Sequence, residues 1–207
     1  LAVSGLFPWA HVAQYIIAQV LGAIFGQLVV VGVYGPYFRK TENPNPVLGS
    51  FSTISALDDG TKASQKASII NGFANEFAGS FVLFFGALAL TKNFFGAELV
   101  GKLLDAGYDE VIASQQVAPY VTGSIAVAHI GVGFLVMALV ASLGGPTGPA
   151  LNPARDLGPR LVHHLLPKSV LGQAKGDSKW WYSWVPVVAP ILAAIAAVAL
   201  FKFLYIK

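Results

Sequence analysis

Four long apolar segments alternate along the chain with polar segments that contain glycine and proline. The apolar segments cover about residues 8–34, 73–91, 120–143 and 185–205. A helix needs about 20 mainly apolar residues to cross the hydrocarbon core of a bilayer, which is about 30 Å thick. Each segment is close to that length, so the pattern predicts four membrane-spanning helices.

The polar segments between these spans predict loops. Residues 34–69 contain charged side chains and two Asn-Pro pairs, which are typical of turns. Within residues 92–119, leucines alternate with Lys102 and Asp105 in a weakly amphipathic pattern. That second segment is therefore predicted to be a loop with a short surface helix.

The composition supports a membrane protein and excludes several other classes. Hydrophobic residues make up 55% of the chain and charged residues 11%, whereas soluble domains carry about 25% charge. The net charge is only +3, and no basic cluster favours nucleic-acid binding. The chain has no cysteine, which excludes disulfides and thiolate catalysis. The expected fold class is an all-α membrane protein.

The segment from Gly144 to Arg160 has the densest polar chemistry of the chain. It reads Gly-Gly-Pro-Thr-Gly-Pro-Ala-Leu-Asn-Pro-Ala-Arg-Asp-Leu-Gly-Pro-Arg and lies between the last two apolar spans. Asn152 followed by Pro153 is typical of a helix start, with asparagine at the N-cap and proline at the first helical position. The helix can continue only to about residue 166, before Pro167. A short helix between two spans predicts a re-entrant half-helix, which is tolerated at membrane depth where it is buried in protein or lines a cavity.

The motif Asn152-Pro153-Ala154-Arg155-Asp156, with Gly-Pro-Arg behind it, resembles the second signature loop of the major intrinsic protein family, the aquaporins and glycerol facilitators. Asp156 after Arg155 resembles the aquaglyceroporin branch in particular. The resemblance implies an aquaporin-like bundle of transmembrane helices in the cell membrane, assembled as a homotetramer, with no cofactor and no catalytic activity.

A faint internal repeat agrees with this layout. Residues 15–24 match residues 186–195, with four identities, as expected of inverted-repeat membrane proteins. We expect residues 1–207 to form a single transmembrane channel domain with four full spans and one complete half-helix. The first two spans and the first signature loop of the family are expected to be absent.

The signature loop predicts a graded set of hydrogen-bonding groups in a pore. A permeating hydroxyl could accept hydrogen bonds from Asn152 and Arg155 and donate to the free carbonyls of non-helical residues. The acceptors proposed for this role belong to Gly148, Pro149 and Ala150. The half-helix dipole and the charge of Arg155 would repel cations and protons. As an alternative, Arg155 forms a salt bridge with Asp156 that only holds the loop. We expect instead that Asp156 points away from the pore and braces the loop.

Two positions of the selectivity filter depart from the glycerol-facilitator pattern. Pro149 stands where that pattern has an aromatic residue, and Val140 stands where it has glycine. These changes favour a channel for glycerol, water and other small uncharged solutes, with undissociated small organic acids such as lactic acid as the alternative. A strict water channel fits less well, because such channels usually have a bulky residue or histidine at the Val140 position.

The other intramembrane polar residues each leave two interpretations open. By resemblance, Glu76 would hydrogen-bond the backbone of a signature loop; alternatively, it is an interfacial residue at a helix N-terminus. Glutamines in the first span are expected to bond other helices or to face the pore. His129 is expected to be a packing contact. A membrane enzyme or receptor would need paired ionisable groups in the spans, for which only Glu76 and His129 are candidates.

The membrane orientation has two conflicting indications. Most lysines and arginines outside the spans lie on the side of the half-helix loop, which the positive-inside rule places in the cytoplasm. The family places that loop outside. We follow the family, because two of these arginines belong to the re-entrant segment itself.

Overall fold

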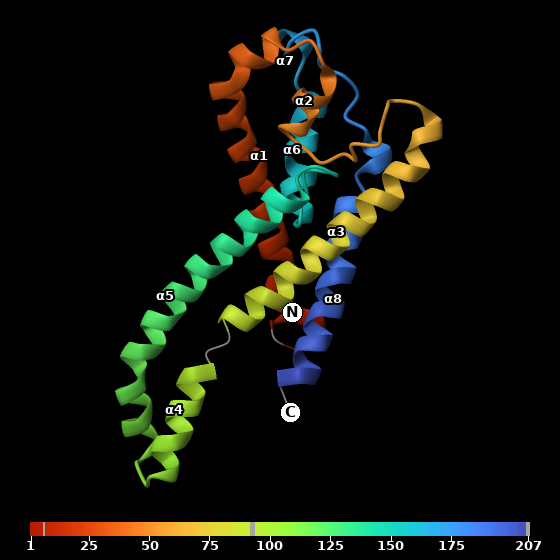
Figure 1. Cartoon of the computed structure of the whole chain (residues 1–207). Helices are drawn as coiled ribbons and strands as arrows, with labels where there is room; N and C mark the ends of the chain where they lie inside the picture. The colour runs from red at the N-terminus through yellow and green to blue at the C-terminus, as the bar shows by residue number, and fades with distance from the viewer. Residues whose placement is uncertain (6, 92–93, 206–207) are drawn as a thin grey trace.

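The computed structural model describes residues 1–5, 7–91 and 94–205 (Figure 1). Within these ranges, the regular elements are all helical. The helices are η1 (Ala2–Ser4), α1 (Trp9–Lys40), α2 (Pro44–Gly49), α3 (Lys62–Thr91), α4 (Phe94–Asp105), α5 (Glu110–Leu143), α6 (Pro153–Leu165), α7 (Lys168–Leu171), η2 (Trp180–Tyr182) and α8 (Val185–Tyr205).

Four stretches of the described helices are long and apolar enough to cross a membrane, which confirms the predicted number of spans. They are Trp9–Lys40, Lys62–Thr91, Ala126–Leu143 and Trp180–Tyr205. Three helices exceed their predicted bounds: α1 continues past Tyr34, α3 starts at Lys62 and α5 starts at Glu110. The apolar pattern marks only the part of a helix that lies in lipid. The backbone hydrogen bonds of a helix continue into the polar region, so hydropathy underestimates helix length.

The helices α3 and α8 form the most extensive pair in the structure and lie side by side in Figure 1. The face of α3 that is buried consists mainly of small residues: Ser68, Gly72, Asn75, Glu76, Gly79 and Ser80. Small residues allow membrane helices to approach closely, because the backbones then meet without intervening side chains. Gly72 instead makes room for a side chain from η2, the element that precedes α8, since a Cβ added there would lie 1.8 Å from the Tyr182 hydroxyl oxygen.

The half-helix α6 packs chiefly against α1. A Cβ on Gly158 would lie 3.0 Å from the Ala23 Cβ and 3.1 Å from the Val20 carbonyl oxygen, so glycine is what permits this approach. The segment that contains α2 (residues 41–61) and the segment from α7 to η2 (residues 168–182) lie against α6 and each other, and we call this region the loop end. A buried apolar cluster holds it together, formed by Phe38, Val47, Phe51, Val162 and Leu171.

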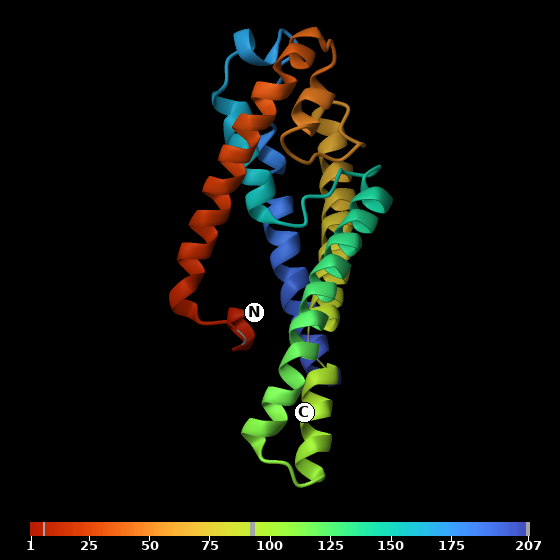
Figure 2. The same ribbon diagram turned by 90° about the vertical axis from the view of Figure 1, so that its left-hand side faces the viewer.

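The loop end and the hairpin of α4 and α5 lie at opposite ends of the molecule in both views (Figures 1 and 2). The C-terminal end of α8 points away from the loop end. The half-helix α6 and the loop before it lie between these extremes, beside α1 and α3. The predicted re-entrant segment therefore begins part of the way along the bundle, where α3 is bonded to the loop before α6 and α6 itself packs on α1 and α8.

We predict that Gly72→Ala weakens the contact between α3 and Tyr182. The added methyl group would overlap the Tyr182 ring, so Tyr182 must move; overpacking of this kind costs about 1–3 kcal/mol. Thermal unfolding of the purified protein in detergent measures the effect. Gly133→Ala on α5 is the matched control, because a Cβ there meets no atom within 4 Å.

The double variant Gly72→Ala/Tyr182→Phe should recover part of the loss. The Tyr182 hydroxyl is buried without a hydrogen-bond partner among the described residues, so its removal costs no bond. An unfolding temperature for Gly72→Ala equal to that of the Gly133→Ala control would contradict this account of the packing.

Candidate functional site

The site begins where the loop after α5 turns into α6. Gly148 and Leu151 have positive φ angles of 60° and 57°, and Asn152 is extended with a φ of −149°. The Asn152 side-chain oxygen accepts a hydrogen bond of 2.9 Å from the Ala154 N–H, and Pro153 occupies the first turn. The prediction of Asn152 as the N-cap is thus confirmed. A leucine at positive φ is strained, which requires the surroundings to hold the loop in place.

Glu76 of α3 holds this loop. Its side chain is fully buried, and its two carboxylate oxygens accept hydrogen bonds from the N–H groups of Ala150 (2.7 Å) and Leu151 (2.9 Å). Among the described residues the peptide bonds are all trans, and in a trans peptide the C=O points opposite to the N–H. The carbonyls of Pro149 and Ala150 therefore point away from Glu76. The carboxylate is positioned to brace the backbone.

The polar side chains of Asn152 and Arg155 face α1 and the loop end, respectively. The Asn152 amide nitrogen donates to the Gln19 side-chain oxygen at 3.1 Å, which links α6 to α1. The Arg155 Nη1 donates to the Phe51 carbonyl oxygen at 2.9 Å, and the side chain is otherwise exposed. Arg155 is therefore held by one backbone carbonyl from the segment after α2.

The next acidic residue, Asp156, pairs with Arg160 and not with Arg155. Its carboxylate accepts from Arg160 Nε at 2.8 Å and from Nη2 at 2.9 Å, and both side chains are fully buried. Asp156 also accepts from the Thr53 N–H at 2.8 Å. Arg160 donates onward to the carbonyls of Thr53 (2.7 Å) and Ser178 (2.6 Å). This pair, the α6 clamp, ties the half-helix to both segments of the loop end, and the alternative of an Arg155–Asp156 salt bridge is wrong.

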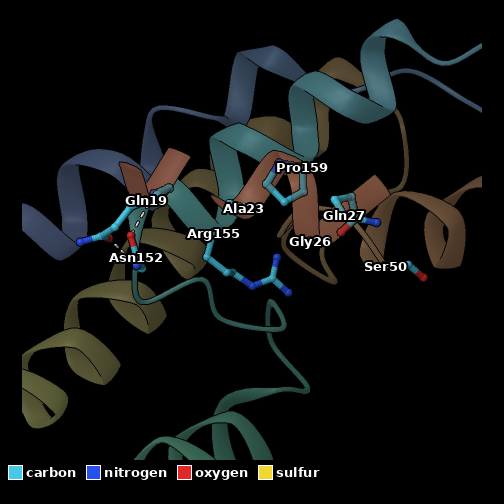
Figure 3. A pocket seen from close by; sticks show the side chains of 9 residues that line it. Gln19, Ala23, Gly26, Gln27, Ser50, Asn152, Arg155 and Pro159 are labelled. Atoms are coloured by element: carbon cyan, nitrogen blue, oxygen red, sulfur yellow. Dashed lines mark hydrogen bonds between the residues drawn. The ribbon is translucent and has the colours of Figure 1, made fainter. Parts of the chain in front are cut away.

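A cavity of about 420 Å³ lies between α1 and α6 (Figure 3). Polar side chains from both helices and small residues that leave room for them form its wall. The lining consists of Gln19, Ala23, Gly26, Gln27, Ser50, Asn152, Ala154, Arg155 and Pro159. Asn152, Arg155 and Pro159 are spaced at i, i+3 and i+7, so they share one face of α6. The cavity thus brings both predicted polar residues of the half-helix to one space.

Several residues predicted for the pore are not among those that line this cavity. Val140 lies on α5, which packs on α3 and α4, and it is 47% exposed. Pro149 and Ala150 are buried in the loop that Glu76 holds, and Gly148 lies just before them. Their part in a selectivity filter stays a prediction.

Sequence reasoning missed three contributions to the site. The Phe51 carbonyl, which holds Arg155, is a backbone group and leaves no signal in the sequence. Gln19 was recognised as a polar residue in a span, but its partner Asn152 lies 133 positions away. Arg160 could have been found, because an acidic and a basic residue at i and i+4 on a helix are neighbours.

His163 adds a titratable group to the loop end, outside the four candidate spans. Its ring is fully buried, its Nδ1 lies 2.8 Å from the Ser178 hydroxyl, and its Nε2 has no hydrogen-bond partner within the described residues. Burial, with the positive charges of Lys175 and Arg160, lowers the pKa of His163 from 6.5 to about 4. The histidine is therefore neutral at pH 7.

We predict that Asp156→Asn destabilises the protein by about 3–5 kcal/mol, because it leaves the buried Arg160 guanidinium without its counter-charge. The midpoint of thermal or chemical unfolding in detergent measures the loss. Asp105→Asn at the exposed end of α4 is the control and should change stability by less than about 0.5 kcal/mol. The double variant Asp156→Leu/Arg160→Met should recover part of the loss; if it recovers none, the ion pair is not the cause.

We also predict a loss of stability in acid that depends on His163. Because folding lowers its pKa, the unfolded chain binds the extra proton first, and stability falls as pH decreases from 6.5 toward about 4. Unfolding temperatures over this range measure the slope. His163→Gln should make the slope shallower than in the wild type. An unchanged slope would assign the acid sensitivity to other groups.

Comparison with known proteins gives consistent matches. The sequence matches the family model described as Major intrinsic protein over residues 1–101 and 110–201. It is 62% identical to the glycerol facilitator-aquaporin gla of Lactococcus lactis subsp. lactis, covering 100% of this chain and 74% of that protein. It is 44% identical to glycerol uptake facilitator protein-like 5 of Lactiplantibacillus plantarum, covering 99% of this chain and 66% of that protein.

The fold also has a counterpart among solved structures. The X-ray structure of the aquaglyceroporin from Plasmodium falciparum matches with a TM-score of 0.59 and 21% sequence identity. The match covers 95% of this chain and 65% of that chain. At this level of identity the comparison supports the arrangement of helices alone.

Proposed function

The chain belongs to the major intrinsic protein family, and we propose that it forms a passive channel through which glycerol, water and other small uncharged solutes diffuse across the cell membrane. Members of this family are multi-pass membrane proteins, in agreement with the four apolar helices. The observation that carries the proposal is the cavity at the start of α6, where Asn152 and Arg155 lie together. The process needs no cofactor and no chemical step, so the protein is not an enzyme in this proposal.

Solute recognition follows from the hydrogen-bonding groups of the half-helix. Within the described ranges, Arg155 donates only to the Phe51 carbonyl and its side chain is exposed, so its remaining N–H donors are available to a hydroxyl oxygen. The carbonyls of Pro149 and Ala150 point away from Glu76 and are the acceptors that we propose for the hydroxyl hydrogen. A hydroxyl that both accepts and donates can exchange its water partners for these groups as it passes.

Ion exclusion follows from the charge of Arg155, because the described residues that line the cavity include no carboxylate. Asp156, the nearest carboxylate in sequence, is buried and committed to Arg160. Arg155 therefore presents a positive charge beside the N-terminus of α6, whose dipole has the same sign. Cations and protons would lose hydration and meet repulsion, which is the device that aquaporin-type pores use.

The alternative solute is an undissociated small organic acid such as lactic acid. Its neutral carboxyl group both donates and accepts hydrogen bonds, as a hydroxyl does, and its size is close to that of glycerol. The departures at Val140 and Pro149 from the glycerol-facilitator pattern support this alternative. Acid flux at low pH tests it directly.

We further propose that additional spans complete the pore and that the protein assembles as a homotetramer. The chain matches 74% of its Lactococcus lactis relative. Helix α1 exposes many large apolar side chains, including Phe25 at 71% and Val33 at 63%. In lipid or against further helices these side chains are covered at no cost, which supports a larger assembly.

Stopped-flow light scattering on liposomes that contain the full natural polypeptide tests the channel proposal. We expect rapid water and glycerol flux without ion leak. Arg155→Val should lower glycerol flux about tenfold and raise proton leak, because the variant removes both the donors and the repelling charge. Arg39→Gln at the end of α1, which does not line the cavity, is the matched control.

Each outcome decides between the proposals. Rapid lactic acid flux at low pH with slow glycerol flux would favour the acid channel. The absence of flux for every solute, or an Arg155→Val variant that behaves as wild type, would refute the pore mechanism.

A further inference from the structure

Gln27 of α1 is a buried amide that the described protein leaves unused. Its side chain is 7% exposed, it lines the cavity between α1 and α6, and its Nε2 has no hydrogen-bond partner within the described residues. A buried donor without a partner destabilises the folded state, because it has lost its hydrogen bonds to water, and buried polar groups are rarely left unpaired. A transient hydrogen-bond partner, such as a permeating solute, would explain the presence of this amide in an apolar helix.

The spacing along α1 places Gln27 at a different level of the cavity from Gln19. Gln19, Ala23 and Gln27 follow one another at intervals of four, so they share a face of the helix. Eight residues of α-helix correspond to about 12 Å along the axis. Gln19 is bonded to Asn152 at one end, and Arg155 lies between them and Gln27 in Figure 3.

Ser50 provides an acceptor at the same end of the cavity as Gln27 (Figure 3). The Ser50 hydroxyl donates to the Pro46 carbonyl at 2.9 Å, so its oxygen lone pairs remain for a hydrogen from a solute. The end torsion of a glutamine side chain is soft, so the Gln27 amide can turn toward a solute without a movement of α1. A solute hydroxyl could accept from Gln27 and donate to Ser50.

We propose that Gln27 is a specificity-determining contact for hydroxyl groups of permeating polyols, placed between the loop end and Arg155. This inference rests on the proposed channel function and adds a solute contact to it. A polyol with several hydroxyls can form hydrogen bonds with Gln27 and Arg155 in succession. Each of these hydrogen bonds replaces one that the solute made with water. A water molecule has one oxygen and needs fewer of these groups to complete its hydrogen bonds, so its permeation depends less on Gln27.

The test compares glycerol and water permeability of liposomes that contain the full natural polypeptide, as wild type and as Gln27→Met. Methionine keeps the length and volume of the side chain and removes the amide. We expect glycerol permeability to fall about five- to tenfold, the effect of one hydrogen bond, and water permeability to fall less than about twofold. Gln14→Met is the matched control, since Gln14 lies on α1 but does not line this cavity, and should change neither.

The ratio of the two permeabilities separates a solute contact from a packing role. An equal fall for glycerol and water, or an unchanged ratio, overturns the inference while wild-type glycerol flux still supports the channel. Absence of wild-type flux overturns both. Because the Gln27 Nε2 has no hydrogen-bond partner in the part of the chain that the structure describes, Gln27→Met and a second variant, Gln27→Leu, should unfold at or above the wild-type temperature. If both fail to fold, Gln27 is structural and the inference is wrong.

Discussion

A loop that leaves helical geometry at membrane depth must have its backbone groups satisfied by protein, because lipid offers no hydrogen bonds. Glu76 meets this requirement with two carboxylate oxygens for two successive N–H groups. One buried residue on α3 thereby fixes the residues just before Asn152. The direction of the Pro149 and Ala150 carbonyls and the entry of the chain into α6 both depend on this contact. The rest of the site is built outward from it.

The second constraint is the α6 clamp at the other side of the half-helix. A buried ion pair is stabilising only when its remaining hydrogen-bonding groups are also satisfied. Thr53 and Ser178 provide these partners from two loop segments that lie far apart in sequence. The half-helix is therefore restrained by Glu76 at its start and by the clamp along its length. A short helix of this kind would be marginal on its own, since its stability comes from tertiary contacts.

The sequence predicted well what local rules determine. The Asn-Pro pair identified the start of α6 because capping involves neighbouring residues, and the apolar runs identified the spans because lipid acts on composition. The predicted ends of helices outside the membrane were wrong, because lipid does not act on the composition of those residues. The backbone partners of Arg155 and Arg160 in the loop end could not be predicted, because Phe51, Thr53 and Ser178 reach them only through tertiary structure, whereas Asp156 lies four residues before Arg160. Gln19 has a hydrogen-bond partner on α6 and the Gln27 Nε2 has none among the described residues, a difference that depends on where α6 lies.

Arg155 and Arg160 show how the same side chain obtains opposite roles in one half-helix. Arg160 is fully buried, and Asp156 neutralises it while carbonyls accept its other donors. Arg155 is exposed to the cavity, and its bond to the Phe51 carbonyl restrains its direction without cancelling its charge. By engaging Asp156, the clamp removes the carboxylate that is adjacent to Arg155 in the sequence as a partner for it. The buried pair thus leaves Arg155 without Asp156 as a counter-charge, as the selectivity against cations that we propose requires, so the stability of the loop end and the chemistry of the cavity are linked.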